Sequence, residues 1–236
     1  MDIPNKTLGV IGGLGPLPTA YLAEMLALYS DVDKDQEHIN LLIHSYPSTP
    51  DRTQFILGRS SQSPLPQILH TGKQLCQLGV DLLAIPCVTS HYFYDTMARE
   101  FSVPLVNMLE ETAAAVQGQG VDCAGIMATS GTVEMGLFQG ALEDKGLRWV
   151  IPEPEWQEKV MYLIYDCVKA GKPMDTKVFY EVFEHLRKKG AKRVILGCTE
   201  LSAINRGESR AKDCVCALES LAKACLRRLG VKVKAL

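Results

Sequence analysis

The chain has 236 residues, 47% of them hydrophobic and 22% charged, with a formal net charge of -2. This composition is ordinary for a globular enzyme with a sizeable core, and the length allows one large domain or two compact ones. The net charge shows no basic excess of the kind that binds nucleic acid or an acidic membrane surface. The apolar runs are far shorter than the ~20 residues of a membrane-spanning helix.

Short apolar runs typical of buried strands alternate with longer segments that have helical spacing. The predicted strands are 7–11, 39–44, 81–85, 105–107, 124–128, 149–151 and 194–196. The predicted helices are 18–29, 66–78, 112–117, 136–145, 155–170, 176–189 and 212–229. This alternation favours an α/β fold with mainly parallel sheets covered by helices.

The ends and the cysteines of the chain bear on its location. Residues 1–6 show no basic stretch followed by a long apolar one, so no signal peptide is predicted. The eight cysteines form no CxxC pair and no regular framework. They are therefore expected to be reduced thiols in a cytoplasmic protein.

A weak internal repeat indicates two halves of similar build. The run from Gly79 to Cys87 resembles the run from Gly190 to Cys198, and in both the cysteine follows the glycine by eight residues. A second echo links the run at 8–13 to the run at 124–129. Gly-led strands are common enough to match by chance, but two matches in the same order favour a repeat. We expect a first domain of residues 1–105 plus 212–236 and a second of 106–211.

Cys87 and Cys198 are the residues that could carry chemistry, because each directly follows a predicted buried strand. Ligands of α/β sheets bind beyond the carboxyl ends of the strands, so both thiols are expected in one crevice between the halves. Two acid–base groups facing each other can take a proton from one face of a carbon and return one to the other. The alternative is that a free cysteine is simply a small buried hydrophobe. That reading is assigned to the other six, Cys76, Cys123, Cys167, Cys214, Cys216 and Cys225.

Five short motifs occur in a specific order along nearly the whole chain. They are Gly12-Gly13-Leu14-Gly15-Pro16, Asp51-Arg52-Thr53, Pro86-Cys87-Val88-Thr89-Ser90-His91, Ala128-Thr129-Ser130-Gly131-Thr132 and Gly197-Cys198-Thr199-Glu200. Together they resemble the aspartate racemase branch of the aspartate/glutamate/hydantoin racemase superfamily. The resemblance implies two pseudosymmetric Rossmann-like domains with the active site in the cleft between them. It also implies an amino-acid racemase that uses two cysteines and needs neither PLP nor another cofactor, and a homodimer.

The resemblance gives roles to two strand-to-helix turns. The first turn, with Gly13 and Leu14, fails as a dinucleotide fingerprint but is plausible as a cradle of backbone N–H groups for a substrate carboxylate. The segment with Thr129, Ser130 and Thr132 would do the same in the second half. The alternative is that both are only tight turns.

Two cations are candidates for holding the substrate. Arg52 lies in a polar loop and has a planar fork suited to a carboxylate, although a surface ion pair with Asp51 is the alternative. The resemblance implies that Arg52 binds the side-chain carboxylate and that Lys169 offers a second cation. Without the resemblance, Lys169 is a charge near a helix C-terminus. Aspartate is therefore the first expected substrate and glutamate the second.

The residues beside the two cysteines are polar. Thr89 and Thr199 are expected to border the substrate, and Glu200 is expected to orient the Cys198 thiol or to meet the substrate ammonium, if it is not merely a helix N-terminal charge. His91 is expected to be structural, because no further ligands stand at a spacing that would make a metal site.

One position departs from the family pattern, which has Asn after the first cysteine where this chain has Val88. Valine cannot pair with a polar group of the substrate, so the identity of the substrate stays open. Two other functions remain as alternatives. One is isomerisation or decarboxylation of a dicarboxylate on the same fold, and the other is binding of an amino acid without turnover.

Overall fold

In the computed structural model, which describes residues 6–206 and 213–234, two parallel sheets form the centres of two halves. The first sheet contains β1 (Thr7–Gly12), β2 (Asn40–Ser45) and β3 (Leu82–Ala84). The second contains β4 (Cys123–Met127), β5 (Arg148–Val150), β6 (Arg193–Leu196) and β7 (Cys214–Cys216). The α/β class with parallel sheets is thus confirmed.

The two sheets repeat the same strand order. The first runs β2-β1-β3 and the second runs β5-β4-β6-β7, with every pair parallel. In each half the first strand along the chain is therefore central, and the strand before the cysteine lies beside it. The predicted internal repeat is present at the level of topology, and Cys87 and Cys198 follow the equivalent strands β3 and β6.

Helices cover both sheets. The α-helices are α1 (Pro16–Tyr29), α2 (Arg52–Ile56), α3 (Leu65–Gln77), α4 (Tyr94–Glu100), α5 (Met108–Gly118), α6 (Ser130–Glu134), α7 (Leu137–Glu143), α8 (Pro154–Tyr162), α9 (Thr176–Lys188) and α10 (Ala217–Leu229). Among residues 6–206 and 213–234, no helix has the length and apolar character needed to cross a bilayer.

Local sequence signals explain where several helices begin. The side chains of Asp51, Asn107, Thr129 and Asp175 accept hydrogen bonds from backbone N–H groups in the first turns of α2, α5, α6 and α9. Such capping satisfies donors that a helix start would otherwise leave open. Gly13 is needed at the turn before α1, because its φ is +88° and an added Cβ would lie 2.4 Å from the backbone nitrogen of Tyr46.

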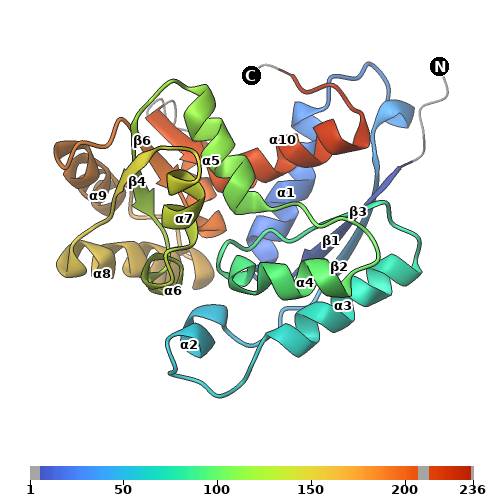
Figure 1. Cartoon of the computed structure of the whole chain (residues 1–236), viewed down its shortest axis with the longest axis horizontal. Coiled ribbons are helices and arrows are strands. Elements are labelled where there is room, and N and C mark those ends of the chain that lie inside the picture. Colours follow the sequence, from blue (N-terminus) through green and yellow to red (C-terminus); the bar gives the residue numbers. More distant parts are fainter. Residues whose placement is uncertain (1–5, 207–212, 235–236) are drawn as a thin grey trace.

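Two contacts between the halves set the position of the site. Helix α10 packs against both α1 and α5 along one side of the molecule, whereas α2 reaches across to α6 on the other (Figure 1). The segment 213–234 contributes to both halves, because β7 extends the second sheet while α10 packs on α1. The exact domain boundaries stay a prediction.

Three predicted elements differ from the structure. The strand expected at 105–107 is a single bridge between Leu83 and Leu105. The helix expected at 155–170 is α8 followed by a π-helical segment, Leu163–Lys169. The helix expected from residue 212, which is itself outside the described residues, begins only at Ala217, because the residues before it pair with β6 as β7. Apolar runs of three residues carry too little periodicity to separate strand from helix.

Candidate active site

Cys87 and Cys198 line one cavity between the two halves. Its wall also includes Leu14, Asp51, Arg52, Thr53, Val88, Thr89, Thr129, Tyr165, Lys169 and Thr199. The cavity volume is about 10 Å³, which is roughly the space that a single water needs. In this structure the cavity is therefore nearly closed, and it must widen before an amino acid fits.

Arg52 is the buried cation on the first side of the cavity. It starts α2 instead of lying in an exposed loop, and its Nη2 donates to the carbonyl of Leu14 at 2.5 Å. Its Nη1 donates to the carbonyls of Thr49 and Pro50 at 3.4 and 3.2 Å, whereas the buried Nε has no partner among the described residues. Burial alone would lower the pKa of Arg52, but Cys87, Asp51 and Glu200 raise it overall. A permanent positive charge therefore stands beside Cys87.

Cys198 has the opposite surroundings. Its thiol donates a hydrogen bond of 2.8 Å to Oε2 of Glu200, and both side chains are buried. Burial and the negative charge of Glu200 raise the pKa of Cys198 well above that of a free thiol. The closed structure thus holds Cys198 as a protonated acid, and the expected role of Glu200 in orienting the thiol is supported by direct contact.

Replacing Glu200 with Gln is expected to lower the pKa of Cys198, because the neighbouring negative charge is removed while the shape is kept. For the enantiomer whose α-proton Cys198 removes, the rate rises with pH as Cys198 ionises. That limb of the pH profile should move to lower pH in the variant. Initial rates of solvent deuterium incorporation at Cα, measured for each enantiomer across pH, check this shift.

Ser202→Ala is the control, because Ser202 lies in the same segment but donates to the carbonyl of Thr199 and does not contact Cys198. Its pH profile should match that of the wild type. An unmoved limb in Glu200→Gln would mean that this carboxylate does not set the ionisation of Cys198.

A clamp of three side chains, Asp51, Tyr165 and Lys169, closes the cavity across the halves. The Tyr165 hydroxyl donates to the two carboxylate oxygens of Asp51 at 3.0 and 3.2 Å, and Nζ of Lys169 lies 3.5 Å from the same carboxylate. Burial would raise the pKa of Asp51, but the backbone N–H of Gln54 and the charge of Lys169 lower it overall. At neutral pH the clamp therefore joins a carboxylate to an ammonium and a phenol.

The clamp is not among the features predicted from the sequence, where Asp51 is only a possible ion-pair partner of Arg52 and Tyr165 has no assigned role. The available signal is the spacing of Tyr165 and Lys169, which are four residues apart and so share one face of a helix. The π-helical winding of this segment is a tertiary feature of a kind that is frequent at functional sites.

Three threonine hydroxyls form a second junction between the halves. Thr89 Oγ1 lies 3.0 Å from Thr129 Oγ1 and 3.1 Å from Thr132 Oγ1, and the latter two are 3.0 Å apart. All three are buried. Each hydroxyl can donate once and accept twice, so the triangle satisfies itself without charge and tethers the segment after Cys87 to the start of α6.

Four of the expected site residues do not line the closed cavity. The backbone N–H of Gly13 donates to Thr19 Oγ1 at 2.9 Å, so it is not open to a carboxylate in this state. Thr132 reaches the site through Thr89, and Glu200 reaches it through Cys198. Ser130 faces a neighbouring groove instead. Leu14, Val88, Thr89, Thr129, Lys169 and Thr199 line the cavity as expected.

His91 has a structural role. Its Nε2 accepts the N–H of Met108 at 3.1 Å, which leaves Nδ1 to donate to the carbonyl of Cys87 at 3.0 Å. Burial lowers the pKa of His91, which favours this neutral form. The ring thereby ties the backbone of Cys87 to the start of α5.

The remaining cysteines lie away from the cavity. Burial raises the pKa of Cys214, Cys216 and Cys225 to about 12, so these thiols stay protonated and inert. Within the part of the chain that the structure describes, no three His, Cys, Asp or Glu side chains are grouped as metal ligands would be.

Comparisons with known proteins agree with the geometry. A family model described as Asp/Glu/Hydantoin racemase matches residues 11–221. The "broad specificity amino-acid racemase RacX" of Bacillus subtilis is 25% identical over 201 residues, which cover 84% of this chain and 86% of that protein.

Solved structures give the same architecture. The aspartate racemase of Picrophilus torridus is 29% identical and superposes with a TM-score of 0.82, covering 97% of this chain and 96% of that one. A glutamate racemase from Francisella tularensis, solved with D-glutamate, has a TM-score of 0.68 at 17% identity and covers 95% and 81% of the two chains. At that identity the second likeness bears on the fold alone.

Proposed function

Because the chain belongs to the Asp/Glu/hydantoin racemase family, whose members are cofactor-independent amino-acid racemases, we propose that it interconverts the enantiomers of an acidic amino acid by means of Cys87 and Cys198. Aspartate is the first candidate and glutamate the second. The observation that carries the proposal is that both thiols line one cavity and that opposite charges stand beside them, Arg52 by Cys87 and Glu200 by Cys198.

Either cysteine can take the α-proton while the opposite one supplies a proton. The contact of the Cys198 thiol with Glu200 supports a first turnover in which Cys198 delivers its proton and Cys87 accepts the α-proton on the opposite face. After this turnover Cys87 carries the proton and Cys198 is the base, which is the state that the other enantiomer needs. Turnover of one enantiomer thus leaves the two cysteines in the protonation states that the other enantiomer needs.

Two cations, the buried Arg52 and the more exposed Lys169, supply the electrostatic part of the mechanism. Removal of the α-proton leaves negative charge that spreads onto the α-carboxylate, and fixed positive charges in a closed site stabilise that charge. Arg52 and Lys169 both line the cavity, and neighbouring groups, above all Glu200, keep the pKa of Lys169 above its ordinary value despite burial. We assign one cation to each carboxylate of a dicarboxylic substrate, Arg52 through its unpaired Nε and Lys169 in exchange for its contact with Asp51.

The test is a screen of solvent deuterium incorporation at Cα over both enantiomers of many amino acids. It detects proton abstraction even where net racemisation is slow. We expect exchange with aspartate or glutamate, without added cofactor and in the presence of EDTA. Exchange with no amino acid would leave the binding of an amino acid without turnover as the better account. Loss of activity on chelation that returns with added metal would contradict a mechanism carried by the thiols alone.

Replacing Val88 with Asn is expected to raise activity on the acidic substrates. Val88 is buried and lines the cavity directly after Cys87, where it offers no hydrogen bond to a substrate amino or carboxylate group. An unpaired polar group costs ~1–3 kcal/mol, or roughly 5- to 150-fold in binding or rate. Steady-state kinetics of Val88→Asn over a panel of amino acids measure the gain.

Val88→Thr is the control, because it keeps the branched shape and adds only a short hydroxyl. A gain in activity confined to aspartate and glutamate would show that the site for acidic substrates is intact and lacks only a hydrogen bond at position 88. If no substrate responds to either change, the side chain at position 88 does not touch the ligand.

Two further features follow from the same resemblance. We propose a homodimer and a cytoplasmic location; the free state of the eight cysteines is compatible with the latter. Light scattering of the purified chain measures the dimer directly. Isomerisation or decarboxylation of a dicarboxylate ranks lower, because such a reaction does not require two opposed thiols.

A further inference from the structure

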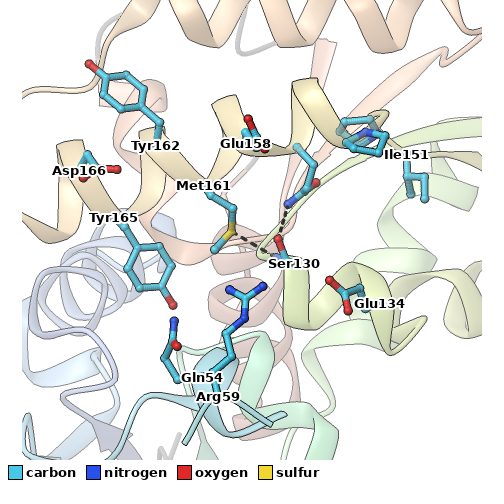
Figure 2. Close-up of a pocket in the computed structure, with 13 residues that line it drawn as sticks. Gln54, Arg59, Ser130, Glu134, Ile151, Glu158, Met161, Tyr162, Tyr165 and Asp166 are labelled. Carbon is cyan, nitrogen blue, oxygen red and sulfur yellow. Dashed lines mark hydrogen bonds between the residues drawn. The ribbon is translucent and has the colours of Figure 1, made fainter. Parts of the chain in front are cut away.

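A groove lies beside the catalytic cavity. Its volume is about 760 Å³, against about 10 Å³ for the cavity. Figure 2 shows its lining side chains, which come from α8 and the two residues that precede it in the lining, from the π-helical segment, from α6, and from α2 and the residues after it. A groove of this size can hold a long side chain, whereas the catalytic cavity of this structure has room for about one water.

Tyr165 is the side chain that the two hollows share. It lines both, whereas the neighbouring pairs Thr53/Gln54 and Thr129/Ser130 place their first residue in the cavity and their second in the groove. The ring of Tyr165 points from the π-helical segment toward Gln54 (Figure 2). Tyr165 therefore stands in the wall that separates the cavity from the groove.

The ring is fixed in this position from two sides. Its hydroxyl donates to both carboxylate oxygens of Asp51 at 3.0 and 3.2 Å. Nζ of Lys169 lies 4.1 Å from the ring centroid, in the range of a cation–π contact. These two contacts hold the Tyr165 ring in the wall between the cavity and the groove.

The linings of the two hollows differ in charge. The cavity presents two cations, Arg52 and Lys169, against one carboxylate, Asp51, and this balance suits short dicarboxylates. The groove presents three carboxylates, Glu134, Glu158 and Asp166, against one cation, Arg59. Its remaining surface includes the apolar residues Ile151, Pro152, Pro154 and Met161. An unbranched apolar stem with a cationic end matches this lining.

We propose that Tyr165 sets the upper limit on substrate length, and that the groove behind it is a side-chain subsite for long amino acids with a cationic end. The inference rests on the proposed racemase activity and deepens it. With the ring in place, only amino acids with side chains as short as those of aspartate and glutamate can place the α-carbon between the thiols. Without it, the cavity and the groove become one site, and lysine fits with its ammonium group toward the carboxylates.

The experiment compares Tyr165→Ala with Tyr165→Phe. Phenylalanine keeps the ring and loses only the bond to Asp51, so it is the matched control for loss of the clamp. The readout is the ratio of kcat/KM for deuterium exchange on lysine to that on aspartate, which does not depend on a uniform loss of rate. One methylene is worth roughly 10- to 200-fold in a fitted pocket. We expect the ratio to rise at least ~10-fold in Tyr165→Ala and to stay near the wild-type value in Tyr165→Phe.

A second substrate and a double variant test whether the groove prefers a positively charged side chain. Methionine is an uncharged probe with a long unbranched side chain, and the double variant Tyr165→Ala/Glu158→Gln removes one carboxylate of the groove. A gain on lysine that exceeds the gain on methionine, and that falls in the double variant, supports the cationic subsite. Equal gains on both amino acids would overturn the assigned charge, because apolar contact alone would then explain them.

The outcomes separate this inference from the proposed function. If the wild type exchanges no amino acid, the racemase proposal fails. If the wild type is active and the ratio of kcat/KM on lysine to that on aspartate does not rise in Tyr165→Ala, the proposal that Tyr165 limits substrate length is overturned. Melting temperatures show whether the variants fold, and Tyr165→Leu takes the place of an unfolded alanine variant. If a folded variant is inactive on every substrate, its affinity for lysine is measured by calorimetry and compared with that of the wild type. A variant that binds lysine no more tightly than the wild type overturns the inference.

Discussion

Replacing either Cys87 or Cys198 with serine is expected to lower the rate of racemisation by ~10²–10⁴-fold, the range typical of a lost acid–base group. Serine keeps the size of the side chain but does not ionise near neutral pH. Both thiols line the one cavity between the halves, so neither can replace the other on its own face of the substrate. Racemisation is followed by chiral chromatography of product formed from each pure enantiomer.

The pattern of residual chemistry is more diagnostic than the loss. A variant with one thiol can still remove the α-proton of one enantiomer and return a solvent proton to the same face. We therefore expect Cys87→Ser to retain deuterium exchange without inversion on one enantiomer, and Cys198→Ser to retain it on the other. Cys76→Ser is the control, since Cys76 is a free cysteine on α3 and does not line the cavity. Full racemisation by either single variant would refute the two-thiol mechanism.

Replacing Arg52 with alanine is expected to reduce activity on aspartate and glutamate by roughly 10- to 150-fold more than activity on alanine or serine. A hydrogen bond to a charged group contributes ~1.5–3 kcal/mol, which corresponds to that range. Arg52 is buried in the cavity wall, and its Nε has no partner among the described residues, so a donor remains for a carboxylate. Values of kcat/KM for the four amino acids measure the difference.

Arg52 also supports the site through backbone contacts. It donates to the carbonyls of Leu14, Thr49 and Pro50, and its loss leaves these groups without that partner. A lower melting temperature is therefore expected as well. Arg59→Ala removes the same charge from the exposed end of this segment and should leave both stability and short-substrate activity near wild type. Equal losses on all four amino acids in Arg52→Ala would assign Arg52 a structural role alone.

Much of the fold and the central pair of the site could be predicted from the sequence. A buried strand followed by a polar turn is a local pattern, and it occurs twice before a cysteine, at Cys87 and at Cys198. Parallel strands place their carboxyl ends at one edge of a sheet, so the two cysteines had to lie at equivalent edges. The strand orders β2-β1-β3 and β5-β4-β6 bear out the repeat that this pattern indicated.

Only the tertiary structure decided how the two edges meet. Asp51 and Tyr165 are 114 residues apart in the chain, and their contact depends on how α2 docks against the second half. The same docking closes the cavity to about 10 Å³ and makes Tyr165 a wall between that cavity and the groove. The N–H of Gly13, which the sequence predicts as a carboxylate donor, instead donates to the hydroxyl of Thr19.

The physical reason for this division is the range of the interactions. Apolar periodicity, helix caps and glycine turns each involve only a few neighbouring residues. The strands, the helices and the loops that carry Cys87 and Cys198 can therefore be predicted from the local sequence. Contacts such as those of Tyr165 with Asp51 and of Thr89 with Thr129 form between surfaces that meet only when the halves pack. Their partners therefore depend on the relative position of the two sheets, which no local pattern specifies.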